Sequence, residues 1–223
     1  MPAGRAPPAS PSYGETLPHA ITDAAVADAA ITDAAADLAA PAASASVLAG
    51  STELRSAEEL RDILGTPHPI VIDKVHDRLT EQDRALLARS PFCALSTADA
   101  DGNCDVSPRG DAPGFTQILD AGTIALPDRP GNRRGDSLHN ILANPHVGLL
   151  YLIPGAREVF RINGRARILT DAPFFDAMTV KGKRPALAVV VEIDEIYLHC
   201  PQSLNRSGIW APETWESAAH PTG

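Results

Sequence analysis

The chain has 223 residues, of which 44% are hydrophobic and 4% aromatic, and its formal net charge is −9. An acidic chain with so few aromatic side chains is a poor candidate for binding nucleic acid, and no apolar run reaches the roughly 18 residues that span a bilayer. The three cysteines include no Cys-x-x-Cys pair, so neither a zinc ribbon nor a disulfide framework is predicted, and we expect a cytoplasmic protein.

Residues 1–50 differ in composition from the rest and are predicted to be an Ala- and Pro-rich, low-complexity extension. They contain an imperfect ten-residue repeat, ITDAAVADAA followed by ITDAAADLAA. Its alanines favour helix, but its apolar anchors are sparse. A flexible acidic tail is therefore the first interpretation, and a helix that binds a partner or docks on the domain is the second. Residues 51–223 are predicted to form the folded domain.

Two short helices are expected at the start of this domain. A capping-box pattern at residues 56–59 opens a helix that runs to Leu64, and Thr80 opens a second one through Arg89. Between them, residues 67–74 form an apolar, Pro-bounded connector.

From residue 91 onward the hydrophobic pattern changes to a period of two, which is typical of strands. Hairpin turns are predicted at Asp101–Gly102 and Ala121–Gly122, and Gly164 is expected to form a bulge inside a long strand. Short helices are expected at residues 137–144 and 171–179, and residues 201–210 read as a polar tail. Strands are predicted at residues 92–97, 104–107, 116–119, 123–126, 147–153, 158–169 and 186–200.

This order of elements predicts a mainly β (α+β) fold: an antiparallel barrel of about six strands with short peripheral helices. The strand at residues 147–153 is nearly unbroken in its apolar character, so we expect it to be buried on both faces. No Gly-x-Gly-x-x-Gly and no P-loop occur, which argues against dinucleotide-binding and NTPase folds.

The segment DRPGNRRGDS at residues 128–137 is the most informative one. Three arginines, an Asn and a Ser surround a Pro/Gly turn just before a predicted helix, whose N-terminal N–H groups favour negative charge. Such a set suits one small anion, such as a phosphate monoester, and the alternative is a solvated loop with Arg–Asp pairs.

A second polar cluster, SPRGDAPG at residues 107–114, lies at the end of the strand predicted at residues 104–107. There Arg109 faces a ligand in one interpretation, and it pairs with Asp111 in a wide turn in the other. The histidines show no metal-binding spacing, and no Gly-x-Ser-x-Gly elbow is present. Any chemistry is therefore expected to depend on a cofactor.

Four motifs in order resemble the pyridoxamine 5′-phosphate oxidase-like flavoproteins, in an FMN-dependent subgroup. They are SPFCALSTADADGNCDVSPRGDAPGF, LPDRPGNRRGDSLHNILANPHVGLLYLIPG, FRINGRARIL and HCPQSLNRSGIW, and they cover roughly 70% of the chain. The resemblance implies a flavin-binding split β-barrel. It also implies a homodimer with FMN in clefts between the subunits.

Carried onto this sequence, the resemblance implies a set of cofactor-binding residues and no assigned catalytic residue. The phosphate would lie against the arginine loop and Ser137, and Arg109 with the strand around Ser107 would meet either the phosphate or the edge of the isoalloxazine ring. Arg161 and Asn163 would face the cleft, and residues of the C-terminal motif would reach the partner's flavin. The full set is Ser107, Arg109, Asp111, Arg129, Asn132, Arg133, Arg134, Ser137, Arg161, Asn205, Arg206 and Trp210. Close relatives usually carry Lys where this chain has Gln202, which affects substrate preference most.

The leading hypothesis is an FMN-dependent oxidoreductase that acts on a small molecule by hydride or electron transfer at the flavin N5. A second hypothesis keeps the fold and places a deazaflavin or heme in the same cleft. A third is a flavin-binding carrier or sensor without enzymatic activity, in which the N-terminal repeat contacts a partner.

Overall fold

The computed structural model describes residues 47–68, 74–156 and 158–215. Most of the predicted N-terminal extension, including its repeat, and most of the predicted connector at residues 67–74 lie outside these ranges. The fold is carried by the unit from Ala57 onward. Among the described residues, no helix is long and apolar enough to cross a membrane.

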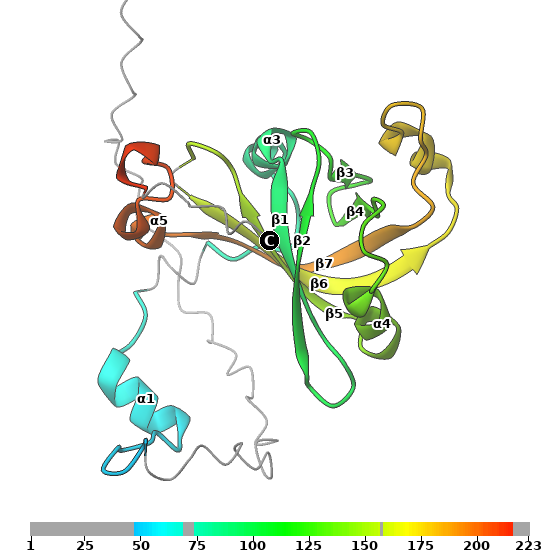
Figure 1. Ribbon diagram of the computed structural model, residues 1–223. Helices are drawn as coiled ribbons and strands as arrows, with labels where there is room; N and C mark the ends of the chain where they lie inside the picture. The colour runs from blue at the N-terminus through cyan, green and yellow to red at the C-terminus, as the bar shows by residue number, and fades with distance from the viewer. Residues whose placement is uncertain (1–46, 69–73, 157, 216–223) are drawn as a thin grey trace, which may run out of the picture. The chain divides into compact units, whose positions relative to one another are not determined.

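Seven antiparallel strands form one sheet, in the order β2-β1-β5-β6-β7-β4-β3 (Figure 1). The strands β2 and β3 are its edges and do not pair with each other, so the sheet curls into a barrel that stays open between them. The predicted split barrel is confirmed: each of the seven predicted strand ranges contains or overlaps one of its strands, although a barrel of about six strands was expected. The strands are β1 (Phe92–Ala98), β2 (Cys104–Gly110), β3 (Gln117–Ile118), β4 (Thr123–Pro127), β5 (His146–Leu152), β6 (Val159–Leu169) and β7 (Ala188–His199).

The edge position of β2 explains why this strand is longer than predicted. It continues through Pro108, which pairs with Ala94 of β1. A proline lacks the N–H that a central strand needs, but an edge strand has neighbours on one side only and tolerates it.

The prediction that β5 is buried on both faces was wrong. Its residues alternate between buried and more exposed positions, with Leu150 37% exposed, so only one face of β5 is buried.

The bulge predicted at Gly164 is confirmed by a register shift between Asn163 and Gly164 in the pairing of β6 with β7. A Cβ atom at Gly164 would lie 2.1 Å from the carbonyl oxygen of Glu192, so only glycine fits at this point of the β6–β7 pairing. The bulge bends the longest strand pair around a core of buried aliphatic and aromatic side chains, with Tyr151, Phe160 and Ile196 among the fully buried ones.

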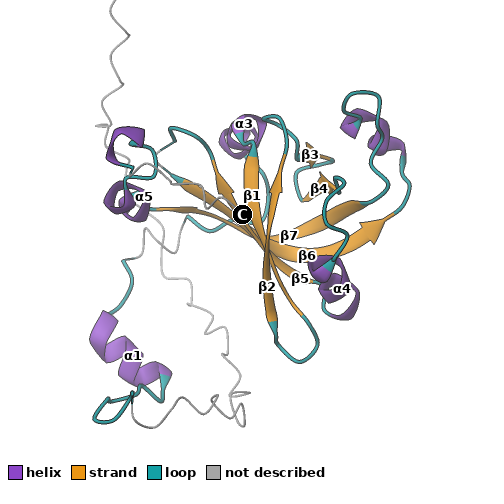
Figure 2. Cartoon of the chain, in the orientation of Figure 1, coloured by secondary structure: helices purple, strands orange, loops and turns teal. Residues whose placement is uncertain are grey.

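The short helices α3, α4 and α5 lie beside the sheet (Figure 2). Thr80 caps α3 through a capping box with Asp83, as predicted, whereas α1 buries none of its residues. The helix predicted at residues 171–179 is a 3-10 helix, Pro173–Met178, and the predicted polar tail contains a helix that ends at Gly208, a residue with φ of 60°. The α-helices are α1 (Ala57–Leu64), α3 (Glu81–Arg89), α4 (Asp136–Ala143) and α5 (Gln202–Ser207), and a second 3-10 helix spans Pro212–Thr214.

Candidate functional site

A cavity of about 710 Å³ lies between the edge strand β2, the loop that follows β4 and the start of α4. Its volume is within the roughly 300–1,000 Å³ of typical small-molecule sites. Residues 105–110 and 127–138, together with Leu187, line it. The two polar segments singled out in the sequence are therefore brought together at one cavity.

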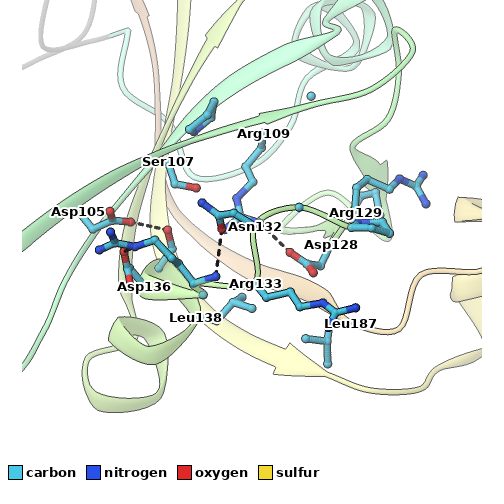
Figure 3. Close-up of a pocket in the computed structure, with 18 of the residues that line it drawn as sticks. Asp105, Ser107, Arg109, Asp128, Arg129, Asn132, Arg133, Asp136, Leu138 and Leu187 are labelled. Atoms are coloured by element: carbon cyan, nitrogen blue, oxygen red, sulfur yellow. Dashed lines mark hydrogen bonds and ion pairs between the residues drawn. The ribbon is translucent and has the colours of Figure 1, made fainter. Parts of the chain in front are cut away.

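Three side chains of β2 point into this cavity because alternate residues of a strand share a face. They are Asp105, Ser107 and Arg109, and Figure 3 shows them in a row above the loop that carries Asn132. Their partners across β1 are Thr97, Leu95 and Cys93, all buried. The sheet thus presents a carboxylate, a hydroxyl and a guanidinium in sequence along one wall.

Two of the predicted arginines are held by carboxylates of the same two segments. Arg109 Nη1 lies 2.8 Å from Asp128 Oδ1, and Arg129 Nε lies 2.7 Å from Asp111 Oδ2. Arg129 also donates to the carbonyl oxygen of Met178, and in Figure 3 its guanidinium is turned away from Arg109. The Arg109–Asp111 pair considered from the sequence does not form, since each residue pairs across to the β4 loop instead.

The remaining two arginines of the loop differ from each other. Arg134 Nε lies 2.8 Å from Asp136 Oδ2 on the surface, where its side chain is 75% exposed. Arg133 makes no ion pair with any described residue, although it lines the cavity. Its φ of 64° is a left-handed conformation that costs a non-glycine residue about 1–2 kcal/mol. The loop therefore holds one free guanidinium in a strained backbone position at the cavity wall.

Asn132 and Ser137 are occupied by neighbours within the loop and the strand. The Asn132 side-chain oxygen accepts a hydrogen bond from the Arg134 backbone N–H at 3.0 Å. Ser137, which is buried at the start of α4, donates to Asp105 Oδ2 at 2.5 Å. Asn140 also donates to Thr97, so two side chains of α4 attach it to the β1–β2 pair.

One buried donor remains available at the cavity. The Nε atom of Arg109 is buried and has no hydrogen-bond partner among the described residues. A buried unpaired donor costs free energy, and a ligand acceptor would remove that cost. Together with Arg133 and the N-terminal backbone of α4, this atom makes the cavity suited to an anionic group.

Other predicted site residues lie elsewhere within one chain. Arg161 and Asn163 are on β6, where their strand neighbours Leu150 and Gly148 form the outer sheet face, and both contact Glu195. The guanidinium of Arg161 lies 5.3 Å from the Tyr197 ring centroid. Neither Arg161 nor Asn163 lines the cavity, and the α5 region, which contains the other three (Asn205, Arg206 and Trp210), contributes no lining residue either.

Three acidic residues at this cavity were not among the site residues predicted from the sequence. Asp105, Asp128 and Asp136 each bind a predicted anion-binding side chain, and Leu187 adds an apolar contact from the segment before β7. All three acids lie within the quoted motifs, so the sequence marked them as candidates. Two of their partners, however, are far away in the sequence and are brought near only by the fold. Among the described residues, no cluster of His, Cys, Asp and Glu is arranged to hold a metal ion.

A sequence model described as "Pyridoxamine 5'-phosphate oxidase" matches residues 79–200. No curated protein matches the chain. Among solved structures, an FMN-binding protein from Syntrophomonas wolfei is 15% identical, with 63% of this chain and 92% of that chain covered and a TM-score of 0.43. HupZ of Group A Streptococcus is 18% identical, with 54% and 93% covered and a TM-score of 0.44. General Stress Protein 26 from Bacillus anthracis is 15% identical, with 51% and 88% covered and a TM-score of 0.39.

Proposed function

The chain belongs to the pyridoxamine 5′-phosphate oxidase family, and from this premise we propose that it is an FMN-dependent oxidoreductase acting on a small molecule. The cavity beside β2 is the proposed cofactor site. The observation that carries the proposal is the donor set there: an unpaired Arg133 and a buried, partnerless Arg109 Nε atom.

These residues fit a phosphate monoester. A guanidinium binds a phosphate through parallel, charge-assisted hydrogen bonds, each worth roughly 1.5–3 kcal/mol. Arg133 would provide the first contact, and Arg109 would turn its free Nε toward the same group. The α4 N-terminus adds backbone N–H groups, although Asp136 in its first turn offsets part of this favourable potential.

The family's cofactor supplies the redox chemistry, by hydride or electron transfer at its N5 atom. The protein's residues bind and orient. Arg109 and Arg133 would anchor the anionic end, and the backbone of β2 and the side chain of Leu187 would line the cavity around the rest of the ligand. No side chain at this cavity is assigned a role as general acid or base.

We extend the proposal to a homodimer in which the cavity is completed by a second copy. The support is the outer face of the sheet, where Val106 is 66% and Leu150 37% exposed and Arg161 stacks on Tyr197. A second copy that covers these apolar side chains would bring the Arg161 and Trp210 regions to its partner's cavity. Sedimentation analysis tests this part: a Leu150→Asp variant is expected to be monomeric, and a wild-type monomer would contradict it.

The experiment that tests the cofactor is a visible absorption spectrum of the purified protein with mass spectrometry of the released ligand. We expect the spectrum of an oxidised flavin and the mass of FMN, whereas a Soret band would indicate heme and a deazaflavin would differ in mass. FMN and riboflavin are then titrated into protein freed of ligand. FMN should bind more tightly by at least about tenfold, because riboflavin lacks the phosphate. Equal affinities, or no binding of either, would contradict the phosphate site.

A further inference from the structure

His76 lies between α3 and the free edge of β7. Its backbone forms a two-way bridge with Ile196: the His76 N–H donates to the Ile196 carbonyl at 3.3 Å, and the Ile196 N–H donates to the His76 carbonyl at 2.6 Å. The strand β4 pairs with β7 only up to Glu192, so His76 meets β7 beyond the end of β4. The segment therefore covers an edge that would otherwise expose backbone groups.

Both nitrogens of the His76 ring face oxygen acceptors. Nε2 lies 2.8 Å from Asp83 Oδ2, and Nδ1 lies 3.1 Å from the carbonyl oxygen of Lys74. A neutral imidazole has one N–H and can satisfy only one of these acceptors, whereas an imidazolium donates to both. The geometry thus selects the protonated ring.

The carboxylate that accepts the hydrogen bond from His76 Nε2 also takes part in capping a helix. Asp83 is 1% exposed, and its Oδ2 atom accepts from the Thr80 backbone N–H at 2.8 Å and from the Thr80 hydroxyl at 2.7 Å. Leu79, which is buried, donates its N–H to Ala121 at 2.7 Å and fixes the other end of the segment. His76 therefore links three parts of the fold: its ring binds α3, its backbone pairs with β7, and it belongs to the segment at residues 74–79.

We propose that His76 is a proton-operated latch, whose imidazolium clamps residues 74–79 onto the free edge of β7 and whose deprotonation releases them. The charged groups that act on the ring are Asp83 from α3 and Asp77 from its own segment. The strand β7 faces His76 with the Ile196 backbone, and the neighbouring Glu195 carboxylate is engaged by Arg161.

The direction of the pH dependence follows from these contacts. Burial disfavours charge on the ring, but the hydrogen bonds to Asp83 and Lys74 and the charges of Asp83 and Asp77 outweigh it, so the pKa of His76 lies above its usual 6.5. A group whose pKa is raised on folding stabilises fully below its unfolded value, and this stabilisation is lost as the pH rises through the folded value. The latch is closed in mild acid and opens toward alkaline pH.

Limited trypsin digestion of the full chain tests the latch, because Lys74 and Arg78 flank His76. Cleavage there is divided by cleavage after Arg61, an exposed site in α1, which removes the pH dependence of the protease itself. Between about pH 6 and pH 8.5 this ratio should rise about tenfold in the wild type, the factor for losing one charge-assisted hydrogen bond of roughly 1.5 kcal/mol.

The matched variant is His76→Gln, which keeps one N–H donor at every pH, so its cleavage ratio should not change with pH. An NMR titration of the wild-type ring should give a midpoint above 6.5. A constant ratio in the wild type, the same pH slope in the variant, or a ring midpoint at or below 6.5 would each overturn the latch.

Discussion

The Nη1 atom of Arg109 lies 2.8 Å from Oδ1 of Asp128, which ties the edge strand of the cavity to the loop after β4. The same two segments form a second pair with the charges exchanged, between Asp111 and Arg129. Both pairs are mostly shielded from solvent, with side chains no more than 28% exposed. The loop that carries Arg133 is therefore held at its root by two crossed ion pairs.

Replacing Asp128 by Asn should increase the affinity for FMN while lowering stability. The carboxylate competes with the phosphate for Arg109, so its removal should tighten binding by about tenfold. The half-buried guanidinium then lacks an anionic partner in the free protein, which should lower the free energy of unfolding by about 1–3 kcal/mol. Fluorescence quenching and urea denaturation measure the two effects. A loss of affinity would mean that Asp128 supports the ligand.

Arg133 and Arg134 should differ sharply in their contribution to FMN binding. Arg133→Ala removes the unpaired guanidinium, so affinity should fall roughly 10- to 100-fold. Arg134→Ala should change the FMN affinity much less, because Arg134 is already paired with Asp136. That exposed ion pair contributes at most about 1 kcal/mol to stability. Neither variant should lose more than about 1 kcal/mol of stability, because loop charges rarely support a core. Equal effects of the two substitutions would show that the phosphate does not distinguish these side chains.

Local signals explain which elements could be predicted from the sequence. The Thr80 capping box and the bulge at Gly164 depend on contacts within a few residues or on the absence of a side chain, and both are confirmed. The predicted end of β2 at residue 107 was wrong, because the strand continues through Pro108 only as an edge of the sheet, and which strand forms the edge is a property of the whole sheet.

The site was predicted only in outline for the same reason. Two motifs meet at one cavity, but the partner of Arg109 is Asp128, which is 19 residues away and on another element. Nothing local distinguishes it from Asp111, which is nearer in sequence. Arg133 can be recognised as the unpaired arginine only from the structure, which shows that the other two arginines of the loop form ion pairs with Asp111 and Asp136.

Gly164→Ala should destabilise the fold strongly. The new Cβ atom would lie 2.1 Å from the Glu192 carbonyl, so the β6–β7 crossing must shift, at a cost of about 1–3 kcal/mol or more. The control is Gly131→Ala, where the nearest atom would be 4.0 Å away and the change should stay within about 0.5 kcal/mol. Urea denaturation compares them, and similar midpoints would contradict the crowding at the bulge.

The three cysteines should react with an aromatic disulfide reagent in two phases. Cys104 and Cys200 are exposed, whereas Cys93 is fully buried. Burial raises the pKa of Cys93 to about 12, against the opposing charge of Arg109, so almost no thiolate forms near neutral pH. Two thiols should therefore be modified quickly at about pH 8, and the third only after unfolding in guanidinium. Three fast thiols in the folded protein would contradict the burial of β1.

Acid should weaken the fold in part through Asp111. The pKa of Asp111 lies below its usual 3.8, first because its carboxylate accepts a hydrogen bond from the Ala112 N–H. Partial burial opposes this shift, but the contact with Arg129 and the charge of Lys181 lower the pKa further. A group whose pKa is lowered on folding stabilises fully above its unfolded value, and this contribution disappears as the pH falls through the folded value. Asp111→Asn should therefore lower the free energy of unfolding at neutral pH and narrow the difference from wild type below about pH 4. Denaturant titrations across this range measure it, with Asp101→Asn in the exposed β1–β2 hairpin as the control. A difference that stays constant with pH would show that the ion pair with Arg129 contributes nothing to the acid response.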